Sequence, residues 1–217
     1  MKLTYSEKTY RSDRVFQTLR DRIVARQYPP GARLSEKELC REFQVSRTPL
    51  REAIRKLEEM KLVNVVPRFG TYVSEVSLDE VRWAYEVRLK LEQLAVELAA
   101  QRATPEQLDR LDLVIGEAEN MGDHPAHGLI SELDNRFHDL ICQMAHNPVL
   151  ADLIYNLRLT CSRLWTTEFR NRLPVGEIAS LGREIFQALK KRDGEAAARL
   201  MFEHVRLSLD RLRKYLL

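Results

Sequence analysis

The sequence predicts a mainly α-helical protein in two parts, a small N-terminal domain with one β-hairpin and an all-helical bundle of six antiparallel helices. Apolar residues recur at helical spacing through most of the 217 residues, whereas a strand pattern occurs only between residues 62 and 73. Charge also divides the chain. Residues 1–76 carry 16 Lys and Arg against 10 Asp and Glu, but residues 77–217 carry 19 against 22. We therefore predict one domain over residues 1–76, whose basic excess suits a polyanion, and a second over residues 77–217.

The N-terminal domain opens with two predicted helices. Residues 1–11 are polar and basic, and we expect them to form a poorly ordered arm. A helix follows over residues 14–26, and the segment 28–31 with its two prolines ends it. Ser35 and Glu38 have the spacing of a capping box, which predicts the start of a second, short helix.

The third predicted helix begins at Ser46, which can cap it, and Pro49 is tolerated in its first turn. Leu50, Ile54 and Leu57 recur at i, i+4 and i+7, so this helix has one apolar face. The pattern predicts that the helix packs on the rest of the domain through that face.

Arg47, Thr48 and Arg51 cannot lie on the apolar face and must project from the start of the helix. A recognition helix that contacts base edges in a DNA major groove has this arrangement, although a capped surface helix with solvated arginines also fits these ten residues alone. Downstream, residues 62–66 and 71–73 flank a turn and predict a hairpin. A helix, a short turn, a second helix and a hairpin make a winged helix-turn-helix.

The polar side chains of this predicted winged helix-turn-helix suggest separate roles. An Arg side chain can donate two hydrogen bonds to guanine, so Arg47 and Arg51 are candidates for base or adjacent phosphate contacts. Thr48 and Lys37 are better suited to hold phosphates.

The turn of the hairpin is a second candidate contact. Gly70 lets the backbone approach a sugar-phosphate chain closely, and Arg68 stands beside it for the minor groove.

Three segments together resemble the N-terminal domain of the GntR family of bacterial transcription regulators: residues 28–34, 45–54 and 68–73. The resemblance runs from about Val15 to Val76. It implies DNA contacts at Arg47, Thr48 and Arg51 and at the tip formed by Phe69 and Gly70, which agrees with the roles inferred from the residues themselves.

The second domain reads as helices separated by proline and glycine breaks. Ser77 can cap the first of them. The breaks predict six helices, at about residues 78–102, 105–120, 127–146, 149–170, 175–191 and 194–216.

Asp134 and His138 are four residues apart and therefore share a helix face, and His204 stands on the last predicted helix. The residues alone leave these histidines as structural groups or as metal ligands. However, this half resembles the FCD ligand-binding domain of the FadR-type branch, in its six-helix, VanR-like form. That resemblance implies a divalent metal held by an Asp, a His four residues later and two further His.

Asp134, His138 and His204 match three of those four positions, but Gly182 stands where the remaining His is expected. Three protein ligands with a water or an effector could still hold Zn, Ni or Mn, and a metal-free pocket is the alternative. His124, His127 and His146 are expected to lie outside the site, in loops or at the surface.

Three residues are candidates for effector binding. Arg88 lies one turn before Glu92, so it could form an exposed intrahelical ion pair worth ~0.2–0.5 kcal/mol or point inward and bind an effector carboxylate. The resemblance implies a ligand-facing Arg in this context, which favours the second interpretation. Asn135 and Arg163 are the other two candidates.

The chain shows no apolar run long enough for a membrane span and no signal-peptide pattern, and its three cysteines are unclustered, as in reduced cytoplasmic proteins. We expect a cytoplasmic, homodimeric regulator rather than an enzyme, with repression favoured. It would bind a short palindromic operator in double-stranded DNA under the control of a small carboxylate. The alternatives are a ligand-insensitive dimeric DNA-binding protein and an α-helical metalloenzyme.

Overall fold

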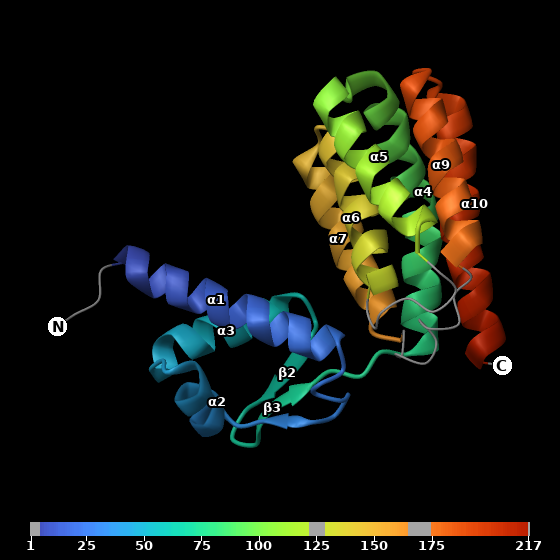
Figure 1. Cartoon of the computed structure of the whole chain (residues 1–217). Coiled ribbons are helices and arrows are strands. Elements are labelled where there is room, and N and C mark those ends of the chain that lie inside the picture. Colours follow the sequence, from blue (N-terminus) through green and yellow to red (C-terminus); the bar gives the residue numbers. More distant parts are fainter. Residues whose placement is uncertain (1–4, 122–128, 165–174, 217) are drawn as a thin grey trace. The chain divides into compact units, whose positions relative to one another are not determined.

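A computed structural model describes residues 5–121, 129–164 and 175–216 (Figure 1). The chain divides into two compact units, Met1–Ser77 and Leu78–Leu217. The first combines helices with a small sheet and the second is helical throughout its described residues, which confirms the predicted fold class. None of the described helices combines the length and apolar character that a membrane crossing requires.

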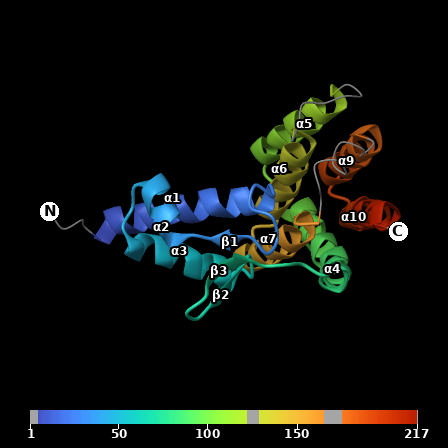
Figure 2. The same cartoon turned by 90° about the horizontal axis from the view of Figure 1, so that it is seen from below.

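The first unit contains α1 (Tyr5–Val24), α2 (Glu36–Phe43) and α3 (Arg47–Glu59), with α3 packed against both other helices. Its sheet has three antiparallel strands in the order β1-β3-β2. Figure 2 shows the hairpin of β2 and β3 projecting from these helices. The strands are β1 (Arg33–Leu34), β2 (Val63–Val66) and β3 (Gly70–Val73).

The prediction of a poorly ordered arm over residues 1–11 is wrong for residues 5–11, because α1 already begins at Tyr5. Ser12 and Asp13, which directly precede the predicted helix and could have capped it, lie inside α1. Asp13 Oδ1 accepts a hydrogen bond from Lys56 Nζ of α3 at 2.5 Å, and Ser12 is buried. Asp13 therefore holds α1 against α3 instead of capping α1.

Helix starts in this unit follow the sequence signals in part. Ser35 caps α2 by accepting from the Glu38 backbone N–H at 3.4 Å. Ser46 has the extended backbone of an N-cap residue, but its side chain makes no capping hydrogen bond, which corrects the expectation for α3. The apolar face of α3 is buried as predicted, with Leu50 and Leu57 fully enclosed.

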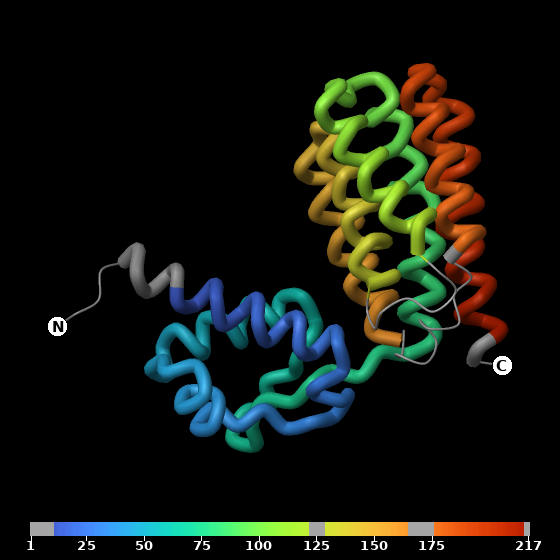
Figure 3. Tube along the Cα trace, in the orientation of Figure 1, coloured from blue at the N-terminus to red at the C-terminus, as the bar shows by residue number. Residues whose placement is uncertain are grey.

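The second unit consists, over its described residues, of helices that pack side by side. Figure 3 shows α4 and α10, from its two ends in sequence, lying next to each other. Helix α4 also packs against α6, α7 and α9, and α5 packs against α6 and α9. The helices are α4 (Leu78–Arg102), α5 (Pro105–Glu119), α6 (Leu129–Met144), α7 (Pro148–Ser162), α9 (Val175–Lys190) and α10 (Gly194–Leu216).

The helix breaks in this unit arise from local capping. Thr104 and Gln107 form a reciprocal capping box with Pro105 between them, at 3.0 and 3.3 Å. Asn147 caps α7 by accepting from the Leu150 N–H at 3.1 Å. Helix α6 ends at Met144, two residues before the predicted end, and His146 follows with a left-handed φ of 48°. Residues 165–170 of the predicted fourth helix lie outside the described residues.

Candidate nucleic-acid interface and metal centre

The first turn of α3 presents polar side chains to solvent. Arg47, Thr48 and Arg51 are all exposed, whereas Pro49 and Leu50 between them are buried. Arg47 forms no ion pair with any residue that the structure describes. Its guanidinium is therefore available to an external acceptor at the N-terminal end of this helix.

Arg51 differs from Arg47 because it has an acidic neighbour. Its Nε lies 3.2 and 3.1 Å from the two carboxylate oxygens of Glu36, at the start of α2. This contact engages Nε and leaves the two terminal nitrogens of the guanidinium for another acceptor. A guanidinium held through Nε is suited to donate hydrogen bonds from its two terminal nitrogens to two atoms of one base.

The turn between β2 and β3 forms an exposed tip. Phe69 is 68% exposed, and Gly70 has a φ of 129°, which residues with a Cβ rarely adopt. Arg68 also has a positive φ, of 70°. Arg33 of β1 lies against this tip, because a Cβ added to Gly70 would be 3.1 Å from its Nε.

Arg33 and Lys37 extend the basic surface around α3 and the tip. Lys37 is an exposed residue of α2, as the sequence suggests. Arg33 was not predicted, because its place beside the tip depends on the pairing of β1 with β3, which brings Arg33 opposite Tyr72. No local signal in a two-residue strand indicates that pairing.

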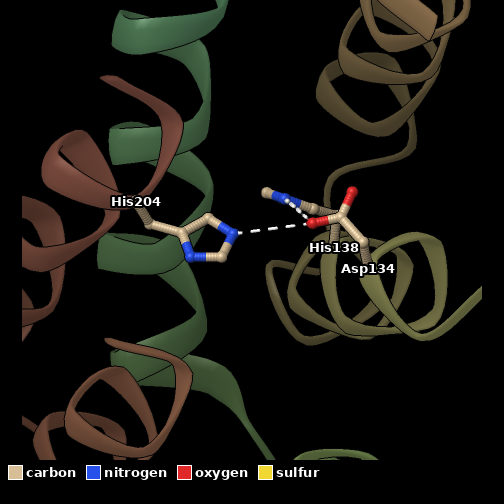
Figure 4. Close-up of side chains that lie close together, drawn as sticks. All are labelled: Asp134, His138 and His204. Atoms are coloured by element: carbon tan, nitrogen blue, oxygen red, sulfur yellow. Dashed lines mark ion pairs between the residues drawn. The ribbon is translucent and has the colours of Figure 1, made fainter. Parts of the chain in front are cut away.

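In the second unit the structure brings together Asp134 and His138 of α6 and His204 of α10 (Figure 4). Their candidate ligand atoms all lie within 4.8 Å of one another. Asp134 Oδ1 is 3.5 Å from His138 Nε2 and 3.7 Å from His204 Nε2. Both histidines are more than nine-tenths buried. One carboxylate oxygen and two imidazole nitrogens therefore converge on one point, as divalent transition metals require.

A carboxylate of α4 orients His138. His138 Nδ1 donates to Glu92 Oε2 at 2.6 Å, so its Nε2 is directed toward Asp134. A histidine that binds a metal through one nitrogen commonly donates the other to a carboxylate, which fixes the ring and its tautomer. Glu92 supplies that partner, and its role was not predicted because it depends on how α4 packs against α6.

The ring nitrogens of His204 also indicate that these residues fit a cation. Among the described residues, neither ring nitrogen of His204 has a hydrogen-bond partner, although its side chain is only 4% exposed. The 3.7 Å separation from Asp134 is too long for a hydrogen bond. A buried polar group without a partner costs ~1–3 kcal/mol, and a bound ion would remove that cost.

The ionisation of these groups is set by burial and by their neighbours. Burial opposes the charged form of Glu92, but Arg88 and His138 outweigh it and lower the pKa of Glu92. Burial likewise opposes the charge on Asp134, whose pKa is nevertheless lowered, mainly by His138. Burial lowers the pKa of His204, which favours the neutral ring that a metal needs.

Burial also disfavours the charged form of His138, but Glu92 outweighs it and raises the pKa of His138. An incoming metal ion therefore competes with a proton at His138.

Arg88 lies inward, which excludes the exposed ion pair that one interpretation of the sequence offered and leaves the binding of an effector by Arg88 a prediction. It forms an ion pair with Glu92, Nε to Oε1 at 2.8 Å, but the pair is buried rather than exposed. Its guanidinium also lies over the Tyr85 ring, 4.8 Å from the centroid. Arg88 is thus engaged by its own helix and supports Glu92, which in turn holds His138.

The other two candidate effector residues are not among the residues that line the pocket next to the metal ligands. Asn135 Oδ1 accepts from Arg158 Nη2 at 2.7 Å, and Arg163 is buried at the end of α7. Arg158, which the sequence analysis missed, also donates to Asp139 at 3.0 Å and lies 4.0 Å from Asp134 Oδ2. Its importance depends on the packing of α7 against α6, which sequence spacing does not reveal.

A small cavity of about 40 Å³ adjoins the metal-ligand cluster. Asp134 and His204 line one part of it, together with Gly182 of α9. The remaining lining is apolar and comes from α5, α6 and α9, including Ile115 and Phe137. Arg88, Asn135 and Arg163 do not line it. Exposed His146 lies apart, at the start of the α6–α7 turn, and His124 and His127 fall outside the described residues.

Comparison with known proteins assigns both units. Residues 11–73 match the model for bacterial regulatory proteins of the gntR family, and residues 84–207 match the FCD domain. The HTH-type transcriptional repressor RspR of Escherichia coli is 34% identical over 194 residues, which cover 89% of this chain and 85% of that protein. The galactonate operon transcriptional repressor of E. coli is 28% identical over 94% of this chain and 97% of its own length.

Among solved structures, E. coli McbR/YncC superimposes with a TM-score of 0.84 at 22% identity, over 95% of this chain and 99% of that one. A putative GntR regulator from Rhodococcus sp. RHA1 gives a TM-score of 0.69 at 24% identity, over 95% and 99% of the two chains. These two likenesses concern the fold alone.

Proposed function

The chain belongs to the GntR family of bacterial regulatory proteins and is a transcription regulator with a DNA-binding domain, not an enzyme, and from this premise we propose that it represses transcription under ligand control. In this proposal the chain acts as a homodimer on a short palindromic operator. The helical domain binds a small carboxylate, with a divalent metal held by Asp134, His138 and His204. The metalloenzyme alternative has no support among the relatives.

The exposed start of α3 is the observation that best supports sequence-specific DNA binding. Arg47 has no described ion-pair partner, and Arg51 keeps its terminal nitrogens available while Glu36 holds Nε. We assign base contacts to these two arginines, each worth ~1–3 kcal/mol of discrimination. Thr48 and Lys37 would hold phosphates, and the tip formed by Arg68, Phe69 and Gly70 would reach the minor groove.

Exposed apolar side chains on two packed helices support a homodimer. On α4, Trp83 is 54%, Val87 48% and Leu94 42% exposed, and their spacing places them along one face. On α7, Val149 is 69% and Leu153 50% exposed. Helices α4 and α7 pack against each other, so these side chains offer a broad apolar surface that a second copy would cover. A two-fold dimer in turn requires a palindromic operator.

The route of regulation follows from the position of α4 in the chain. Strand β3 ends at Val73 and α4 begins at Leu78, so a very short segment joins the tip region to this helix. The same helix carries Glu92, which is hydrogen-bonded to His138. A ligand that favours one position of α6 and α10 relative to α4 would thereby favour one of two positions of α4. Only a ligand with different affinities for two arrangements can have this effect.

A bound divalent metal would supply positive charge between the buried groups and an open position for an anionic ligand. The donors are oxygen and nitrogen, without sulfur, so zinc, nickel and manganese all suit them. Asp134 and His204 would face the pocket, and His138 would be held in place by Glu92. A ligand-insensitive dimer is the remaining alternative, and it predicts that no small molecule alters DNA affinity or thermal stability.

Selection from a pool of random DNA duplexes tests DNA reading directly. The purified chain is incubated with the pool at near-physiological salt, where non-specific binding is weak, about 10⁻⁴–10⁻⁶ M, and the retained duplexes are sequenced. Selections with and without added zinc should enrich a short inverted repeat in at least one condition. If both selections returned unenriched sequences, the assignment of DNA contacts to α3 and to the hairpin tip would be wrong.

A further inference from the structure

Arg33 leaves β1 on the outer face of the three-stranded sheet. Its neighbour in the strand, Leu34, is only 3% exposed, and successive side chains of a strand point to opposite faces. Arg33 itself is exposed and lies opposite Tyr72 of β3, so these two side chains share the outer face. Arg33 can therefore extend along the outer surface of the sheet.

The side chain of Arg33 ends at the hairpin tip. Gly70 stands two residues before Tyr72 in β3, which makes it a diagonal neighbour of Arg33 and brings it within reach of a long side chain. A Cβ added to Gly70 would lie 3.1 Å from Arg33 Nε, 3.6 Å from Nη2 and 3.8 Å from Cζ. The guanidinium thus takes the space that a side chain at position 70 would occupy, although Arg33 belongs to a segment well before the hairpin in the chain.

Two hydrogen bonds hold the tip in place. The Tyr72 hydroxyl donates to the Phe69 carbonyl oxygen at 3.3 Å, within the hairpin. The Val65 N–H of edge strand β2 donates to Glu58 Oε1 of α3 at 3.1 Å, which ties the hairpin to that helix. A cation at the tip therefore has a defined position relative to α3, and it would meet DNA at a defined distance from the bases that α3 contacts.

The tip carries two guanidinium groups side by side. Arg68 is exposed in the turn itself, and Arg33 comes from β1, which lies beside β3 at about 4.8 Å. Neither arginine forms an ion pair with a residue that the structure describes. The minor groove narrows over runs of A·T pairs, and its negative potential then increases and attracts arginine. Two uncompensated cations gain more from that potential than one.

We propose that Arg33 enters the minor groove beside Arg68 and makes this protein select operators with an A·T-rich segment where the tip binds. This inference rests on the proposed function, because it names a sequence preference within the operator. The preference acts through groove width rather than through one base, so it extends over several pairs and accepts A·T and T·A alike.

Two duplexes test the proposal. The first is the duplex that the wild-type chain selects, and in the second the A·T-rich segment beside each half of the repeat is replaced by G·C pairs. The wild type should bind the second duplex about tenfold more weakly at fixed salt, whereas Arg33→Ala should bind it less than about threefold more weakly than the first. Fluorescence anisotropy measures both ratios, which do not depend on the fraction of active protein.

Arg41→Ala is the matched control. Arg41 is an exposed arginine in the last turn of α2, in the same unit but away from the tip, so this variant should keep the full penalty for G·C pairs. A phosphate contact or a purely structural role of Arg33 predicts that Arg33→Ala weakens binding to both duplexes by the same factor. That result, or an unchanged penalty in Arg33→Ala, would overturn the proposal.

The failure of this inference differs from the failure of the proposed function. The selection with the wild-type chain reports on both. An enriched inverted repeat without any A·T-rich segment would overturn the role of Arg33 and leave the sequence-specific regulator intact. Absence of an enriched repeat would instead overturn the proposed function.

Discussion

Arg51 and Arg88 each contact a carboxylate, but in opposite surroundings. The side chains of Arg51 and Glu36 are 64% and 33% exposed, whereas those of Arg88 and Glu92 are 7% and 3% exposed. An exposed guanidinium can exchange its carboxylate for a base or a phosphate at little cost. A buried one cannot, because separation would leave two charges without compensation. The first pair therefore suits recognition, and the second supports the fold and the metal ligands.

The largest expected effect comes from breaking the buried pair. Arg88→Ala should reduce the free energy of unfolding by ~3–5 kcal/mol, since Glu92 would remain buried without its cation. Arg199→Ala is the control, because Arg199 forms an exposed pair with Glu195 on α10. Its expected loss is below ~0.5 kcal/mol. Urea unfolding followed by helical circular dichroism measures both, and similar losses would remove the distinction drawn between buried and exposed pairs.

The next effect concerns His204, a buried side chain whose ring nitrogens have no hydrogen-bond partner among the described residues. Zinc at about 100 times its dissociation constant should stabilise the wild-type chain by ~2.7 kcal/mol. His204→Ala should lose most of this gain, whereas exposed His146→Ala should retain it. Thermal unfolding with and without zinc provides the measurement. Equal stabilisation of wild type and His204→Ala would show that zinc binds elsewhere.

A smaller effect is expected at the exposed start of α3. Arg47→Ala should weaken binding to the selected duplex by ~1–3 kcal/mol at fixed salt, with little change in stability. Arg110→Ala, an exposed arginine of α5 in the helical domain, should leave DNA affinity unchanged. Fluorescence anisotropy with a labelled duplex measures both variants. If Arg47→Ala bound as tightly as wild type, α3 would not be the recognition helix.

Much of the fold was predictable because local signals determine it. Thr104 with Pro105 and Asn147 with Pro148 mark helix starts through capping contacts that the structure contains. Strand β1 was not predictable, because two residues become a strand only through pairing with β3. The start of α1 was misplaced for a related reason, since Asp13 contacts Lys56 of a helix distant in sequence.

The candidate site shows the same limit more strongly. Asp134 and His138 share a face by their spacing, so sequence alone could pair them. The roles of Glu92 and Arg158 depend on how α4 and α7 pack against α6, and no spacing reports that. For Arg88 the spacing indicated the partner, Glu92, but the residues alone could not decide between an exposed and an inward side chain, and burial decides what the residue can do.

The central claim is that the pocket of the helical domain controls DNA binding, and one titration tests it most directly. The dissociation constant for the selected duplex is measured by anisotropy with zinc alone and with zinc plus each member of a panel of small carboxylates. A coupling of about 1–3 kcal/mol predicts a change of at least fivefold for one of these acids, and the change should be absent in His204→Ala. Identical binding curves with and without every acid of the panel in the wild-type chain would contradict the claim.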